Sequence, residues 1–75
     1  MIEITTLDDL METHMDTDPD RLRYFFEDGP DDVITDRLYM REFFARHGDD
    51  ELVDFRIYRD EGLVLEVTLK GDGTE

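Results

Sequence analysis

Four acidic residues in the first half of the chain have the spacing of oxygen ligands for a divalent cation. Asp16, Asp18 and Asp20 alternate with other residues, and Glu27 occupies the twelfth position counted from Asp16. Carboxylates at the first, third, fifth and twelfth positions of a loop are an arrangement that binds calcium. These four residues are therefore a candidate metal site. Asp18 followed by Pro19 is also typical of a helix start, which is the competing interpretation.

Over residues 16–27 the sequence resembles the calcium loop of EF-hand proteins, and the resemblance implies calcium ligation by the same four carboxylates. The sequence departs from the family pattern at the sixth position, where Arg21 replaces the glycine of a sharp turn, and at the eighth, where Arg23 replaces an aliphatic residue. Gly29-Pro30 also interrupts the helix that would follow the loop. We therefore favour helix capping for this stretch and expect no cofactor.

The residue types give little support for nucleophilic catalysis, phosphate binding or a histidine metal site. The chain contains no serine and no cysteine, and phosphate-binding glycine loops are absent. Its two histidines, His14 and His47, are too few for a histidine cluster, although either could join carboxylates around a metal ion. The acidic residues are so numerous that no pair stands out for general acid-base catalysis. We expect that the protein is not an enzyme.

Negative charge is the strongest feature of the sequence. The chain has 22 acidic and 8 basic residues, which gives a formal net charge of -14. Residues 31–47 are nearly neutral, and the first twenty residues contain no lysine or arginine. Two groups of acidic residues are candidate contacts for a partner. The first is Asp8, Asp9, Glu12, Asp16, Asp18 and Asp20, and the second is Asp49, Asp50, Glu51 and Asp54.

A protein of this charge is repelled by nucleic acids and by anionic lipids. We therefore expect no direct binding to nucleic acid or membrane, and a partner with a basic surface, such as a nucleic-acid-binding protein. A row of carboxylates along one helix face has spacings comparable to those of phosphates along a nucleic acid strand. In composition the chain is similar to phage inhibitors that mimic nucleic acid, such as anti-CRISPR and anti-restriction proteins. The similarity implies a DNA-mimicking inhibitor that blocks a DNA- or RNA-binding groove.

Two alternatives remain open. The acidity could reflect salt adaptation in a small accessory domain, which could form a homodimer through the aromatic flank of residues 31–47, near Tyr39 and Phe43. The protein could also be a divalent-cation binder that uses the candidate metal site described above.

Local patterns predict the elements that would position these residues. Ile2 to Thr5 reads as a short strand, residues 6–15 as a helix with a capping box, residues 18–26 as a second helix, and residues 31–47 as a third. Leu52–Arg59 and Leu63–Leu69 alternate as strands, joined at Asp60-Glu61-Gly62. The prediction is an α+β fold of order β-α-α-α-β-β, with a three-stranded antiparallel sheet covered by three helices.

Length and composition complete the expectations. Seventy-five residues predict one domain, which we place at residues 1–70, with a flexible tail at 71–75. The absence of cysteine excludes disulfides, and no long apolar run or signal-like N-terminus is present. We therefore expect a cytoplasmic protein.

Overall fold

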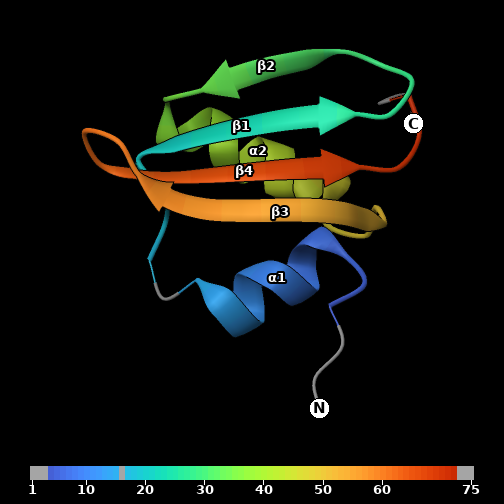
Figure 1. Ribbon diagram of the computed structural model, residues 1–75, viewed down its shortest axis with the longest axis horizontal. Helices are drawn as coiled ribbons and strands as arrows, with labels where there is room; N and C mark the ends of the chain where they lie inside the picture. The colour runs from blue at the N-terminus through green and yellow to red at the C-terminus, as the bar shows by residue number, and fades with distance from the viewer. Residues whose placement is uncertain (1–3, 16, 73–75) are drawn as a thin grey trace.

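The computed structural model describes residues 4–15 and 17–72, and within them the chain forms two helices and four strands (Figure 1). In chain order the elements are α1 (Leu7–His14), β1 (Arg21–Phe26), β2 (Asp31–Ile34), α2 (Arg37–His47), β3 (Leu52–Arg59) and β4 (Leu63–Leu69). The fold is α+β with the order α-β-β-α-β-β. The α+β class is confirmed, and the predicted three helices and three strands are wrong.

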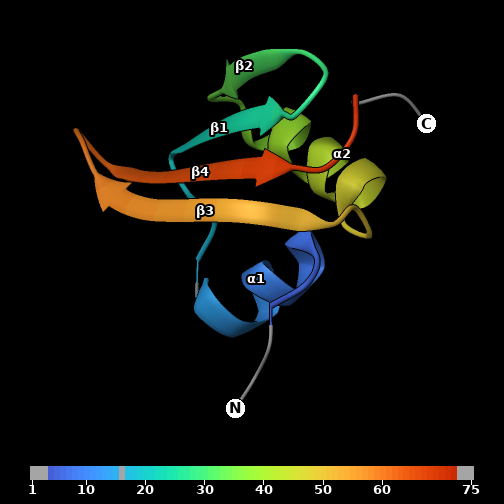
Figure 2. The same cartoon turned by 45° about the vertical axis from the view of Figure 1, so that its right-hand side comes forward.

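The strands form one mixed sheet in the order β2-β1-β4-β3. The central strands β1 and β4 are parallel, whereas β2 with β1 and β3 with β4 are antiparallel. The chain reaches this arrangement because the segment between β1 and β4 crosses from one edge of the sheet to the other through α2. Figures 1 and 2 show α2 behind β1 and β4, and α1 beside β3. Neither helix covers the sheet face turned toward the viewer in Figure 1.

The core lies between the two helices and the covered face of the sheet. Period-two alternation sends every second strand residue toward this side. Leu7 and Leu10 enter the core from α1, and Met40 and Phe43 enter it from α2. The sheet contributes the buried residues Leu22, Phe26, Leu65, Val67 and Leu69. Within the described residues, no helix has the length and apolar character needed to cross a membrane.

Residues 21–26 form the strand β1 and not the helix predicted after Asp18-Pro19. The spacing of Leu22 and Phe26 fits a helix, but the same residues also fit a strand, with Tyr24 between them on the same face. Aromatic residues favour strands when they can pack on a sheet. β1 pairs with β2 on one side and with β4 on the other, so its backbone groups are bonded within the sheet.

Residues 31–34 also form a strand, so the predicted helix at 31–47 is correct only for its C-terminal part. The pairing of β2 with β1 takes up the first four residues. Asp36 then caps α2, because its extended backbone lets its Oδ1 accept hydrogen bonds from the Leu38 nitrogen at 2.8 Å and the Tyr39 nitrogen at 3.4 Å.

The predictions for the N-terminal strand and for the C-terminal hairpin had different outcomes. The strand predicted at Ile2–Thr5 falls partly on residues 1–3, which lie outside the described part, and Ile4 and Thr5 are not in a strand. Thr6 pairs with Glu51 only as an isolated bridge. The hairpin of β3 and β4 is confirmed, and Gly62 has the positive φ of 130° expected at its turn. Of the predicted tail, residues 73–75 also lie outside the described part.

Candidate functional site

The predicted acidic helix α1 begins with a complete capping box. The Asp9 nitrogen donates to Thr6 Oγ1 at 3.2 Å, and Asp9 Oδ2 accepts from the Thr6 nitrogen at 3.2 Å. Asp9 Oδ2 also accepts from the Thr5 hydroxyl at 2.7 Å and from the Thr5 nitrogen at 3.3 Å. These hydrogen bonds, led by the one from the Thr5 hydroxyl, lower the pKa of Asp9 because they stabilise the ionised form.

The N-terminal end of α1 is bonded to the turn between α2 and β3. The Asp8 nitrogen donates to the Gly48 carbonyl at 2.9 Å, and the Leu7 nitrogen donates to the Asp50 carbonyl at 3.3 Å. The Asp8 carboxylate lies against Gly48 and leaves no room for a Cβ there. Two acidic groups that are about forty residues apart in the sequence therefore meet. We call the combined region the α1–turn surface, which consists of Asp8, Asp9, Glu12, Asp49, Asp50 and Glu51.

Three carboxylates of the α1–turn surface already have partners within the chain. Asp9 serves the capping box, Asp50 Oδ2 is 2.8 Å from His47 Nδ1, and Glu51 Oε2 is 3.3 Å from Lys70 Nζ. Asp8, Glu12 and Asp49 are exposed. Among the described residues, the side chains of these three make no hydrogen bond or ion pair within the chain.

The remaining predicted contacts lie elsewhere. Asp18 and Asp20 precede β1, and Asp20 Oδ2 accepts from the Leu63 nitrogen at 2.8 Å, which ties this segment to the start of β4. Asp54 is on β3, where its Oδ1 accepts from the Phe55 nitrogen at 2.8 Å. Asp16 lies outside the described residues. The first predicted group is therefore divided between two regions of the molecule.

Two of the candidate metal ligands, Asp20 and Glu27, lie far apart. Asp20 precedes the six-residue strand β1 and Glu27 follows it, which separates them by roughly 20 Å along an extended chain. An ion in contact with one of these carboxylates is out of reach of the other. In residues 4–15 and 17–72, no group of three or more histidine, aspartate or glutamate side chains is placed to hold a metal ion.

His47 and Asp50 form a pair of the kind that orients a catalytic base, but its surroundings favour a structural role. The His47 side chain is buried, and its ring centroid lies 5.2 Å from that of Phe26 and 4.7 Å from that of Phe43. The hydrogen bond to Asp50 therefore joins the C-terminal end of α2 to the acidic turn. It gives a buried polar group its partner.

The uncovered face of the sheet carries a group of residues that the sequence interpretation missed. Arg23, Glu66 and Arg56 lie side by side across β1, β4 and β3. The Arg56 guanidinium is 4.0 Å from the Glu66 carboxylate. Arg23 lies 5.7 Å from the centroid of the Phe25 ring, and Arg56 lies 5.3 Å from that of Tyr58. Alternation along residues 21–26 would have placed Arg23 and Phe25 on one face, which the helical interpretation concealed, whereas the row itself depends on the pairing of β4 with β1 and β3.

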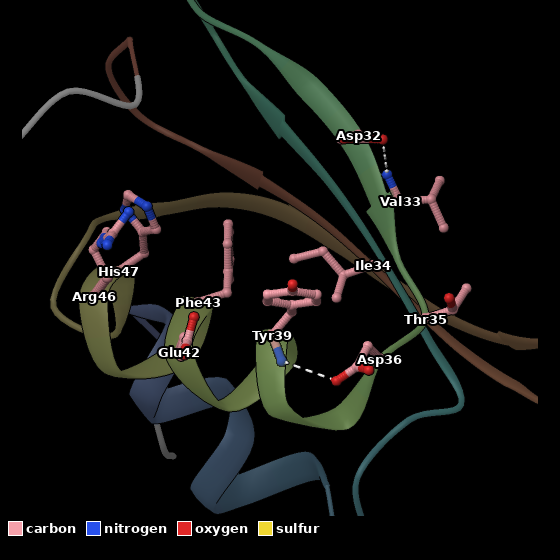
Figure 3. Close-up of a pocket in the computed structure, with 10 residues that line it drawn as sticks. All are labelled: Asp32, Val33, Ile34, Thr35, Asp36, Tyr39, Glu42, Phe43, Arg46 and His47. Atoms are coloured by element: carbon pink, nitrogen blue, oxygen red, sulfur yellow. Dashed lines mark hydrogen bonds between the residues drawn. The ribbon is translucent and has the colours of Figure 1, made fainter.

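A cleft between β2 and α2 was also not predicted. Its volume is about 460 Å³, which is within the range of small-molecule pockets. Figure 3 shows Ile34, Tyr39 and Phe43 pointing into the same space between the strand and the helix. Asp32 and Glu42 are among the charged residues that line it. Residues 31–47, which were expected to form one helix, supply both walls.

Tyr24 packs beside this cleft, with its ring centroid 4.6 Å from that of Phe43. Burial raises the pKa of Tyr24, and the negative charges of Asp32 and Asp31 raise it further, because both effects disfavour the phenolate. Asp31 and Asp32 therefore place negative charge near the Tyr24 hydroxyl.

Comparison of the chain with protein-family models, with curated proteins and with solved structures finds no match, so the functional argument depends on the surfaces described above.

Proposed function

We propose that this protein is a non-enzymatic acidic protein that binds a basic protein surface through the α1–turn surface. In this role it would act as a nucleic-acid-mimicking inhibitor, of the anti-CRISPR or anti-restriction type, that occupies the DNA- or RNA-binding groove of its partner. The observation that carries the proposal is the meeting of two acidic segments, which makes one anionic surface from the start of α1 and the turn that contains Asp49.

The spacing of the carboxylates supports this role. Asp8 and Glu12 are one helical turn apart, so their β-carbons are separated by roughly 5–6 Å. Arginine and lysine side chains that bind nucleic acid phosphates also bind carboxylates at such spacings. The hydrogen bonds from Thr5 and Thr6 lower the pKa of Asp9, so this carboxylate stays ionised to a lower pH than an ordinary aspartate does.

The distribution of basic residues also supports it. α1 contains no lysine or arginine, and Arg23 and Arg56 of the sheet lie on its uncovered face. Lys70, which contacts Glu51, and His47, which contacts Asp50, lie within ion-pair distance of the α1–turn surface. A basic partner would therefore meet little repulsion at this surface.

The test begins with capture of proteins from a cell lysate on the immobilised protein at about 0.05 M salt, followed by release at about 0.5 M salt, because screening weakens electrostatic complexes. Each captured protein is then purified and assayed for displacement of a labelled DNA or RNA by this protein. We expect displacement by the unaltered chain. We expect displacement to weaken at least tenfold in the triple variant Asp8→Asn, Glu12→Gln and Asp49→Asn.

A matched control removes the same number of charges elsewhere. The triple variant Glu27→Gln, Asp28→Asn and Glu61→Gln changes exposed residues that lie outside the α1–turn surface and belong to neither predicted group of contacts. It should keep displacement within about threefold, since only the long-range field is reduced. Equal losses in the two triple variants would show that the acidity acts without a defined surface, and this result would contradict the proposal.

A further inference from the structure

We propose that the β2–α2 cleft binds an organic cation, namely a guanidinium or ammonium group carried on an apolar stem. This site is separate from the α1–turn surface, and it does not depend on the proposed function. Neither the charge pattern of the sequence nor the acidic surface accounts for it.

The apolar part of the ligand would lie among Ile34, Tyr39 and Phe43. Phe43 is almost fully buried at the base, whereas Tyr39 is 63% exposed and stands at the opening (Figure 3). A cleft of about 460 Å³ can accept a side-chain-sized or drug-sized group. The ring face of Tyr39 also attracts a cation, because its π-electrons carry partial negative charge.

The cationic group of the ligand would contact the carboxylates that line the cleft. Asp32 is on the β2 wall, Asp36 is at the start of α2, and Glu42 is on the exposed side of α2. Asp32 Oδ1 accepts a hydrogen bond from the Val33 nitrogen. Asp36 Oδ1 accepts hydrogen bonds from the Leu38 and Tyr39 nitrogens at the start of α2. A carboxylate has about four acceptor positions, so each retains capacity for a guanidinium or ammonium donor.

The other titratable groups of the cleft are Arg46 and His47, which lie together near the C-terminal end of α2 (Figure 3). Three carboxylates thus face one arginine and one histidine. An anionic ligand would meet net repulsion, and a neutral ligand would lack the attraction between opposite charges even where it donates hydrogen bonds to the carboxylates. Burial raises the pKa of Tyr24 and the charge of Asp32 raises it further, so the field of this carboxylate acts beside the cleft.

The test is a titration of the full chain, followed by nuclear magnetic resonance, with benzylguanidinium as the probe. Its neutral isostere benzylurea is the matched control ligand. We expect saturable shifts confined to the amides around Ile34, Tyr39 and Phe43 with the cation, and at least tenfold weaker binding of benzylurea. Equal binding of the two probes, or shifts spread over α1 and its acidic residues, would overturn the proposal.

Two variants separate a defined site from general attraction. Glu42→Gln should weaken benzylguanidinium binding at least threefold, whereas Glu12→Gln makes the same change on the exposed face of the other helix and should leave the affinity within twofold. Equal effects of the two variants would overturn the proposal. Bound cation should also lower the pKa of Tyr24, followed through its ring resonances, because it offsets the charge of Asp32.

A guanidinium or ammonium group on an apolar stem can belong to a side chain of a partner protein or to a free small molecule. A capped tripeptide with arginine at its centre distinguishes these sources when it is compared with benzylguanidinium. Comparable affinity for the peptide would assign the cleft to a protruding arginine side chain, and exclusion of the peptide would assign it to a free organic cation. The acidic triple variant of the proposed function leaves the cleft unchanged, so the two proposals can fail separately.

Discussion

Asp9 combines a structural role with a place on the α1–turn surface. Its carboxylate accepts hydrogen bonds from Thr5 and Thr6, so it holds the start of α1 in the position where Asp8 and Glu12 are exposed. The same hydrogen bonds lower its pKa below the ordinary value of 3.8. The stability of the helix start is therefore linked to pH.

We predict that Asp9→Ala destabilises the fold at neutral pH and that the difference from the unaltered chain shrinks in acid. A carboxylate with a lower pKa in the folded state stabilises the fold fully above its unfolded pKa of 3.8. That stabilisation is lost as the pH falls from this value through the lowered pKa of the folded state. Urea unfolding at pH 7 and at pH values below 3.8 measures the difference.

Thr6→Ala is the control for this prediction. It removes the hydroxyl that caps the helix and should cost about 1 kcal/mol at neutral pH. Its cost should change less with pH than that of Asp9→Ala, because the Thr6 hydroxyl is the smallest of the causes that lower the pKa of Asp9. A cost of Asp9→Ala that stays constant as the pH falls below 3.8 would contradict the linkage.

At the scale of elements, β4 is the centre of the molecule. It pairs with β1 on one side and with β3 on the other, and Leu65 at its middle is fully buried. Core residues of both helices and of β4 belong to one hydrophobic cluster, so β4 supports the packing of α1 and α2.

We predict that Leu65→Ala lowers the free energy of unfolding by about 2–5 kcal/mol, through lost burial and the cavity left behind. Leu38→Ala is the matched control, because Leu38 is 69% exposed on α2 and its replacement should change stability by no more than about 0.5 kcal/mol. Urea denaturation at about 0.5 M salt measures both variants. Similar losses for the two leucines would contradict the observed core.

The predictions were correct for the elements that patterns of neighbouring residues determine. α1 is recognisable from Thr6 and Asp9, and the hairpin from its alternation and Gly62, since each pattern involves neighbours in the sequence. β1 and β2 could not be recognised in this way. Leu22 and Phe26 fit a helix and a strand equally, and the partner that decides between them, β4, is about forty residues away.

At the scale of the whole molecule, the net charge of -14 opposes folding through self-repulsion. The charges are nevertheless segregated. The α1–turn surface is acidic, and the uncovered sheet face carries Arg23 and Arg56 around Glu66. The net charge of the chain therefore does not describe any single face of it.

We predict that the melting temperature rises as sodium chloride increases from about 0.02 M to about 0.5 M. The reason is that the screening length falls from well over 10 Å to a few ångströms over this range. The rise should be smaller in the triple variant of Asp8, Glu12 and Asp49, which carries three fewer negative charges. Differential scanning calorimetry measures the effect, and a melting temperature that falls with added salt would contradict it.

The sequence by itself determined the excess of acid, the capped helix α1 and the β3–β4 hairpin, because composition and short-range patterns depend only on neighbouring residues. Only the tertiary structure decided which acidic residues share a surface. Backbone hydrogen bonds to Gly48 and Asp50 bring distant carboxylates to the start of α1, whereas β1 separates Asp20 from Glu27. The arginine row also depends on pairing between distant segments, since β1 pairs with β4, whereas the β2–α2 cleft depends on residues 31–34 forming a strand and not a helix.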